Sequence, residues 1–325
     1  MERYRAPWWL PGGNAQTVWP ALRSGPRGAH GHAAARYQRE RWSTPDGDFI
    51  DVDVQAQAPL APWLVLFHGL EGSSHSHYAL AFARQAALEG MNFAVPHFRG
   101  CSGALNLAPR AYHSGDFEEV SWILARLRAR AAAPLSVVGV SLGGNALLRW
   151  AQESGSLAAQ TASSVAAVCS PIDLAAGGHA LGRGLNRISY TPMFLRTMKP
   201  RALAKLAQFP GLFDRRRLLA ARDLYEFDNV FTAPLHGFRD TDDYWARGSA
   251  KPHLHRIRIP ALVLNARNDP FVPADCLPAA AQVGDHVTLW QPAHGGHVGF
   301  PTATRRGDRA MTMPAAVLGW LRSHA

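Results

Sequence analysis

The chain has 325 residues, of which 47% are hydrophobic, so it can bury a sizeable core and fits one α/β domain that carries an insertion. The net charge of +10 comes from 34 basic and 24 acidic residues. The basic residues are scattered along the chain, which argues against nucleic-acid binding and leaves open a weak peripheral attraction to anionic membranes or to acyl-carrier surfaces. The cysteines at 101, 169 and 276 are too few and too far apart for a disulfide framework or a zinc knuckle, and we expect a reducing, cytoplasmic location.

Residues 1–34 form an N-terminal extension ahead of the first predicted strand. Its apolar stretch at 8–13 is interrupted by proline and glycine and lacks the continuous apolar segment of a signal peptide. Elsewhere, too, no apolar run approaches the roughly 20 residues that cross a bilayer. We therefore expect a soluble protein, in which Trp8, Trp9 and Trp19 either pack on the body or touch a membrane interface.

After this extension, strand and helix patterns alternate, which is typical of a mostly parallel sheet with helices on both faces. The first two strands, 35–44 and 49–55, flank the turn Pro45-Asp46-Gly47-Asp48, so we expect them to be antiparallel. The further expected strands are 63–67, 92–96, 135–140, 164–169, 259–264 and 286–290, and the expected helices are 76–89, 116–130, 145–151, 274–282 and 311–322. Residues 35–173 and 257–325 therefore form the predicted core.

The pentapeptide Gly139-Val140-Ser141-Leu142-Gly143 lies between a buried strand and a helix. A Gly-x-Ser-x-Gly in this place is typical of a nucleophile elbow, in which a sharp turn projects the serine hydroxyl from the sheet edge. The flanking glycines remove side chains that would collide there. The pattern alone also suits an ordinary tight turn, or a turn that holds a phosphate at a helix N-terminus.

The strand and helix alternation stops between residues 174 and 256, a stretch rich in aromatic residues and arginine. It contains helical pieces, such as 202–208 and 215–224. We expect a helical cap inserted into the core over the active site. Some of its side chains suit short or medium acyl chains, although each also suits a core: Tyr190, Met193, Phe194, Phe227 and Phe231.

A serine nucleophile needs a base and a carboxylate, which follow it in the order Ser, Asp, His in the α/β-hydrolase fold. Asp269 comes just beyond the strand that ends at Leu264, and His297 just beyond the next strand. Both are therefore expected at the carboxyl edge of the sheet, where catalytic loops lie. Asp275 and His294 are the rival carboxylate and the rival base.

The oxyanion hole is expected to combine the backbone N–H of Leu142 with that of Leu70, in the loop after strand 63–67. His68 in the same loop is interpreted as a residue that braces it rather than as a base. The pairs His75/His77 and His253/His255 have no neighbouring carboxylate or cysteine cluster, so we expect no metal.

Several further motifs accompany the elbow: Gly12-Gly13-Asn14-Ala15-Gln16-Thr17, His68-Gly69-Leu70-Glu71-Gly72-Ser73, Phe98-Arg99-Gly100-Cys101-Ser102-Gly103, Tyr112-His113-Ser114-Gly115-Asp116, Asp269-Pro270-Phe271 and Gly295-Gly296-His297-Val298-Gly299-Phe300. Through these motifs the chain resembles the YheT-like esterases of the α/β-hydrolase fold over most of its length. The resemblance implies Ser141, Asp269 and His297 as the charge-relay residues, in agreement with the strand order. Asn268 departs from the family, which often has a second Asp there.

These observations predict a serine carboxylic ester hydrolase that acts through an acyl-enzyme on small-molecule short- to medium-chain acyl esters, without a cofactor. One alternative is an acyltransferase that passes the acyl group from the same serine to an alcohol. The sequence lacks the His-x-x-x-x-Asp motif of some acyltransferring relatives, which favours hydrolysis. The other alternative is a non-catalytic member of the fold that binds a lipid or a protein. The sequence carries no signal for an oligomeric state.

Overall fold

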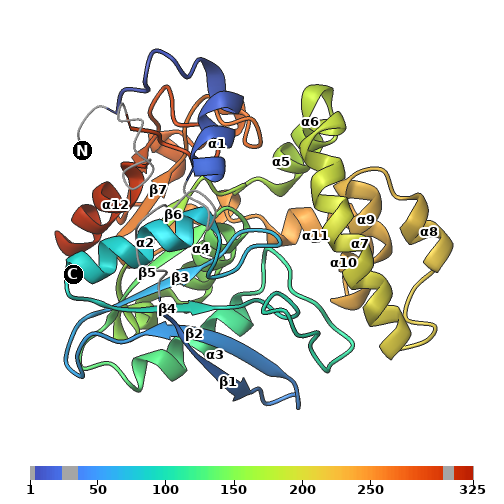
Figure 1. Ribbon diagram of the computed structural model, residues 1–325, viewed down its shortest axis with the longest axis horizontal. Helices are drawn as coiled ribbons and strands as arrows, with labels where there is room; N and C mark the ends of the chain where they lie inside the picture. The colour runs from blue at the N-terminus through green and yellow to red at the C-terminus, as the bar shows by residue number, and fades with distance from the viewer. Residues whose placement is uncertain (1–3, 24–35, 303–310, 325) are drawn as a thin grey trace.

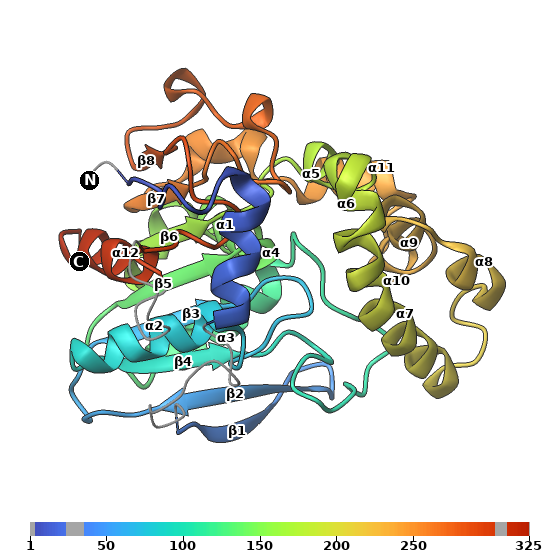
Figure 2. The ribbon, with the colours of Figure 1, turned by 45° about the horizontal axis from the view of Figure 1, so that its top comes forward.

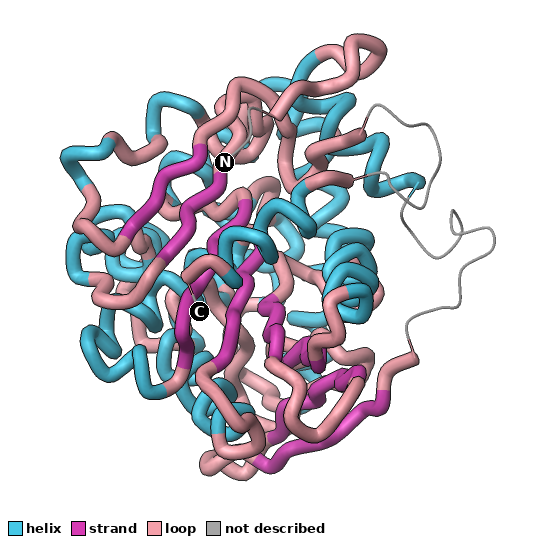
Figure 3. The backbone as a smooth tube through the Cα atoms, turned by 90° about the vertical axis from the view of Figure 1, so that its left-hand side faces the viewer, coloured by secondary structure: helices cyan, strands magenta, loops and turns pink. Residues whose placement is uncertain are grey.

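The computed structural model describes residues 4–23, 36–302 and 311–324, so Ala35, where the first strand was expected to begin, lies outside the described residues. Eight strands form one sheet in the order β1-β2-β4-β3-β5-β6-β7-β8 and lie side by side in Figure 3. The strands are β1 (Gln38–Ser43), β2 (Phe49–Gln55), β3 (Trp63–Phe67), β4 (Asn92–Pro96), β5 (Leu135–Val140), β6 (Ala162–Val168), β7 (Ala261–Leu264) and β8 (Val287–Trp290).

The sheet is mostly parallel, as predicted. Strand β2 pairs antiparallel with both β1 and β4, and the pairs from β4 across to β8 are parallel. Every residue of β3 and of β5 is buried, because helices cover both faces of the parallel part. The two predictions, a parallel sheet and an antiparallel first pair, are confirmed.

The two faces of the sheet carry separate helix layers (Figure 2). Val65 packs in one core with helices α3 (Phe117–Arg128) and α4 (Leu142–Ser154). Its neighbours Leu64 and Leu66 pack in the other core, with α2 (His77–Leu88) and α12 (Met313–Arg322). This alternation follows from the two-residue period of a strand, which directs successive side chains to opposite faces.

The segment between β6 and β7 holds helices and no strand, and it stands to one side of the sheet in Figure 1; we call residues 174–256 the helical insertion. Asn145 of α4 links the helical insertion to the core. Its Nδ2 donates to Gly248 O at 2.8 Å, and its Oδ1 accepts from Ala250 N at 3.0 Å. The helices are α5 (Leu174–Leu181), α6 (Gly184–Ile188), α7 (Tyr190–Gln208), α8 (Arg215–Ala220), α9 (Leu224–Val230), α10 (Thr232–Leu235) and α11 (Thr241–Gly248), followed by the 3-10 segment η2 (Lys251–Arg256).

Two helix predictions were wrong in extent. The helix expected at 215–224 is split into α8 and α9, because the Asp223 side chain accepts from Glu226 N and starts a new helix there. The helix expected at 274–282 is two short 3-10 segments, η3 (Ala274–Cys276) and η4 (Ala280–Gln282). Pro278 lies between them, and a proline disfavours helical dihedrals in the residue before it.

Several enclosed titratable side chains make the fold sensitive to acid. Burial lowers the pKa of His68 and His113 to about 3 and that of His77 to about 4. In the unfolded chain these imidazoles have pKa values of about 6.5. Burial acts in the opposite direction on two carboxyls, raising the pKa of Asp228 to about 6 and raising that of Glu119.

We therefore expect the free energy of unfolding to fall as the pH drops below about 6.5. Between the folded and unfolded pKa values the unfolded chain binds more protons at these three histidines, and two raised carboxyls offset only part of that difference. The expected slope is roughly 1–2 kcal/mol per pH unit between pH 6.5 and 5. Urea unfolding at pH 7.5 and 5.5 checks it, and an equal or higher midpoint at pH 5.5 would contradict it.

Candidate functional site

Ser141 sits on the turn between β5 and α4 with φ +54° and ψ −121°, a conformation that costs a non-glycine residue energy. The flanking glycines permit this turn. A Cβ on Gly139 would lie 2.4 Å from Gly143 O, and a Cβ on Gly143 would lie 2.5 Å from Phe67 O. The chain can therefore pass from β5 into α4 at this sharp angle only if both positions lack a side chain.

The structure brings Ser141, His297 and Asp269 together from three separate segments. His297 Nε2 lies 3.1 Å from Ser141 Oγ, and His297 Nδ1 lies 2.8 Å from Asp269 Oδ2. The other Asp269 oxygen accepts the backbone N–H groups of Phe271 and Val272 at 2.8 and 3.3 Å, which fixes the carboxylate. The Phe271 ring packs on the His297 ring with centroids 4.3 Å apart. The hydroxyl, imidazole and carboxylate thus form one hydrogen-bonded chain.

The rival residues lie outside this chain. His294 is exposed, and its Nδ1 lies 3.4 Å from the amide nitrogen of Asn268. Asp275 is exposed in η3. His68 is fully buried, with Nδ1 2.8 Å from Gly69 O and Nε2 3.1 Å from Phe98 N, so both ring nitrogens are engaged by backbone groups. This geometry suits a residue that braces its loop.

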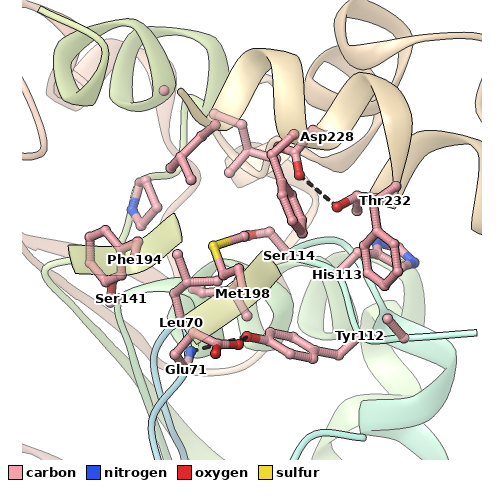
Figure 4. Close-up of a pocket in the computed structure, with 18 of the residues that line it drawn as sticks. Leu70, Glu71, Tyr112, His113, Ser114, Ser141, Phe194, Met198, Asp228 and Thr232 are labelled. Atoms are coloured by element: carbon pink, nitrogen blue, oxygen red, sulfur yellow. Dashed lines mark hydrogen bonds between the residues drawn. The ribbon is translucent and has the colours of Figure 1, made fainter. Parts of the chain in front are cut away.

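The loop that contains Leu70 lies directly against the serine. A Cβ on Gly69 would be 3.1 Å from Ser141 Cβ, and Gly69 N donates to Tyr78 OH at 2.8 Å. The next residue, Glu71, is left-handed at φ +56°, and its N–H donates to Tyr112 OH at 3.0 Å. Leu70 and Leu142 both line the cavity that Ser141 borders, and Figure 4 labels Leu70 and Ser141.

Gln16 and Thr17, for which the sequence predicts no role, hold the loop that carries His297. They belong to helix α1 (Gly12–Arg23), which lies across the core in Figure 2. Thr17 Oγ1 accepts His297 N at 2.8 Å, and Gln16 Oε1 accepts Gly295 N at 2.8 Å and the Asn268 side-chain amide at 3.0 Å. Their only sequence signal was the matching motif at 12–17.

The contact between α1 and the loops that carry Asp269 and His297 is close. A Cβ on Gly13 would lie 1.8 Å from Asn268 O, and a Cβ on Gly299 would lie 1.9 Å from Gln16 O. Asn268, the position that departs from the family, also accepts Gly296 N at 3.0 Å. The α1 helix therefore touches both the loop that carries Asp269 and the loop that carries His297.

We expect Thr17→Val to lower kcat by roughly ten- to a hundredfold with little change in KM, because a buried His297 N–H that loses its acceptor costs about 1–3 kcal/mol and releases the loop. Thr17→Ser keeps the acceptor and should retain most of the activity. Steady-state kinetics with a soluble ester check this. Equal kcat values for the valine and serine variants would contradict a positioning role.

Of the described residues, one group of three metal-ligating types lies close together: Cys169, Asp269 and His297. Asp269 and His297 are already bonded to each other. Burial raises the pKa of the Cys169 thiol well above its usual value, and its sulfur accepts Val298 N at 3.2 Å. Asp269 and Cys169 thus already have partners in the protein, an arrangement that fits the hydrogen-bonded chain.

A cavity with about 1130 Å³ of empty space, open mouth included, lies between the core and the helical insertion. Its lining is mostly apolar and reaches from Ser141 to the Asp228 side chain on α9 (Figure 4). Asp228 accepts the Thr232 hydroxyl at 2.6 Å and Trp245 Nε1 at 3.0 Å. Of the five side chains expected to suit an acyl chain, Phe194, Phe227 and Phe231 border the cavity. The other two do not, since Met193 is exposed and Tyr190 packs on Phe271.

The sequence profile of the α/β hydrolase fold family matches residues 62–304. YheT of Escherichia coli (strain K12), which is named as a candidate esterase, is 38% identical over 292 residues, covering 88% of this chain and 84% of YheT. Mouse phospholipase ABHD3 is 29% identical, covering 82% of this chain and 66% of that protein. A monoacylglycerol lipase of Saccharomyces cerevisiae is 26% identical, covering 81% and 59%.

Solved structures agree on the fold. Mouse α/β hydrolase domain-containing protein 10 superposes with a TM-score of 0.56 at 12% identity, covering 89% of this chain and all of that one. Est1E from Butyrivibrio proteoclasticus, solved with ferulic acid, superposes with a TM-score of 0.55 at 12% identity, covering 89% and 99%. The chain belongs to the α/β hydrolase fold family, as a YheT-like hydrolase of the esterase and lipase type.

Proposed function

We propose that the protein is a serine carboxylic ester hydrolase that acts through an acyl-enzyme on short- to medium-chain acyl esters. One observation carries the proposal: His297 lies within hydrogen-bond distance of both Ser141 Oγ and Asp269 Oδ2. A base held in one tautomer by a carboxylate, and placed beside a hydroxyl on a strained turn, is the arrangement that activates a serine.

In the first half of the proposed reaction, His297 Nε2 takes the proton of Ser141, and Oγ bonds to the ester carbonyl carbon. The N–H groups of Leu70 and Leu142 stabilise the oxyanion of the tetrahedral intermediate. The bond from the carbonyl carbon to the alcohol oxygen then breaks, and His297 gives its proton to the leaving alcohol. In the second half, His297 deprotonates a water, which attacks the acyl-enzyme and releases the acid and Ser141.

The lining of the cavity supports an apolar acyl group. Phe194, Met198 and Phe231 border it, and apolar contact gains about 0.8 kcal/mol per buried methylene. We place the protein in the cytoplasm, because its three cysteines are free and buried, as suits a reducing compartment.

A chain-length series of p-nitrophenyl esters, with a fluorophosphonate probe in parallel, tests the proposal. We expect the probe to label Ser141, and kcat/KM to rise from acetate to a medium chain and then fall once the cavity is full. Products in aqueous ethanol should be mainly the free acid, which separates hydrolysis from acyl transfer. A folded protein that neither reacts with the probe nor cleaves any ester would refute the proposal.

A further inference from the structure

Six exposed apolar side chains gather on α1, its preceding residues, α6 and the first turn of α7. The adjacent residues Trp8 and Trp9 differ in exposure. Trp9 packs edge-on against Trp19 with ring centroids 5.1 Å apart, whereas the side chain of Trp8 is 89% exposed. Exposing large apolar groups together is unfavourable in water and marks a surface that meets a partner. We call this set the apolar rim: Trp8, Val18, Leu22, Leu185, Ile188 and Met193.

The two parts of the apolar rim lie on the same side of the molecule. Gly13 of α1 packs against Asn268 O, while Asn186 of α6 donates to Pro270 O at 2.6 Å, so both helices rest on one short loop. Tyr190 OH at the start of α7 donates to Asn14 Oδ1 of α1 at 3.1 Å. Figure 1 accordingly shows α1 and α6 at the same edge, next to α5.

The segments that carry the apolar rim are also rich in basic residues. The sequence has no Asp or Glu from position 3 to 39 or from 174 to 213, and the second stretch contains six basic residues. Three of them, Arg183, Arg187 and Arg196, are exposed, and in the described part of the chain none of the three forms an ion pair. A carboxylate from outside these stretches comes close at one point, since a Cβ on Gly182 would lie 3.8 Å from Asp223 Oδ2. Apolar side chains beside arginines, in segments that themselves contain no acid, are the composition of a segment that lies in a membrane interface.

We propose that the apolar rim and its flanking arginines dock on an anionic lipid surface. The apolar side chains would enter the boundary between headgroups and acyl chains, and the arginines would contact lipid phosphates. The rim consists of single protruding side chains on separate short segments. A fluid lipid surface accepts such a shape without matching pockets, whereas an acidic protein partner would need them.

The docked orientation would bring the cavity to the lipid. Phe194 and Met198 line the cavity from α7, while Met193 of the same helix points outward at 53% exposure. Esters leaving the bilayer would then have a short apolar path into the cavity. This consequence rests on the proposed function, whereas the docking itself does not.

Co-sedimentation of the purified full-length protein with vesicles tests the docking. We expect binding to phosphatidylglycerol vesicles, weaker binding to phosphatidylcholine vesicles, and a loss of binding in 0.5 M salt, where charges are screened within about 4 Å. The double variant Leu185→Ser/Ile188→Ser should bind about tenfold more weakly, because two apolar side chains no longer insert.

The matched control is Leu60→Ser/Leu157→Ser, which alters two leucines that are 81% and 64% exposed. They precede β3 and β6, at the edge of the sheet opposite the Ser141 turn, and should leave vesicle binding unchanged. Both double variants should cleave soluble p-nitrophenyl butyrate as fast as the parent protein. A loss of vesicle binding at unchanged hydrolysis then reports on docking and not on catalysis or folding. Two results would overturn the proposal. One is that the protein does not bind phosphatidylglycerol vesicles, as expected if the rim instead meets an acidic protein. The other is that the two double variants bind these vesicles equally well.

Discussion

Replacing Ser141 with alanine is expected to lower kcat for p-nitrophenyl butyrate by about 10⁴- to 10⁶-fold, because the variant lacks the hydroxyl that lies beside His297 and that we propose forms the acyl-enzyme. The Oγ atom is 3.1 Å from His297 Nε2, and the Ser141 turn is set by the backbone and by Gly139 and Gly143. The variant should therefore fold normally while it loses the reacting atom.

The control is Ser163→Ala on β6, which removes a hydroxyl that donates to Leu135 O at 3.4 Å, away from the cavity. It should keep the parent activity. Circular dichroism and thermal melting show whether each variant is folded, and intact mass after fluorophosphonate treatment shows whether it is labelled. A folded Ser141→Ala variant with parent-like turnover would exclude this serine as the nucleophile.

The second large effect separates the two histidines of one loop. We expect His297→Ala to lower kcat by about 10³- to 10⁵-fold, because it removes the base, and we expect His294→Ala to stay within about threefold of the parent. The chain places them differently. His297 is hydrogen-bonded to Asp269 and lies beside Ser141, whereas His294 is exposed and its Nδ1 lies 3.4 Å from the Asn268 side-chain nitrogen. Steady-state kinetics on both variants, side by side, give the comparison.

Asp269→Asn adds a test of how the base is held. The oxygen of the asparagine would keep the backbone N–H donors of Phe271 and Val272, so its NH2 would face His297 Nδ1 and hold the imidazole in the wrong tautomer. We expect kcat to fall by about 10³- to 10⁴-fold with the histidine still present. If His294→Ala proved as damaging as His297→Ala, the loop would have to rearrange before reaction, and the assignment of the base would be wrong.

Much of the core was predictable because its signals are local. The run Trp63–Phe67 and the run Leu135–Val140 are continuous apolar segments, and the structure has strands with those bounds. The positions of Asp269 and His297 after successive strands placed them at one sheet edge, since parallel strands share their carboxyl edge. Strand order alone therefore predicts that Ser141, Asp269 and His297 lie close together.

The features that escaped prediction depend on contacts between distant segments. Nothing near Thr17 in the sequence shows that its hydroxyl accepts the N–H of His297, 280 positions away. The sequence of the helical insertion likewise does not show which apolar side chains border the cavity. Met193 and Phe194 are adjacent and both apolar, yet Phe194 borders the cavity and Met193 is exposed. Which face of a helix meets a cavity is decided by packing that no single segment encodes.

The contact between α1 and the His297 loop has a consequence for the order in which the protein is made. Helix α1 leaves the ribosome 280 positions before His297, so Gln16 and Thr17 must wait for all the segments in between. Contacts of such high sequence separation form slowly, because a long loop must close first. A nascent chain could thus complete much of its sheet before these contacts exist, and the proposed ester cleavage would arise only when α1 and the His297 loop meet.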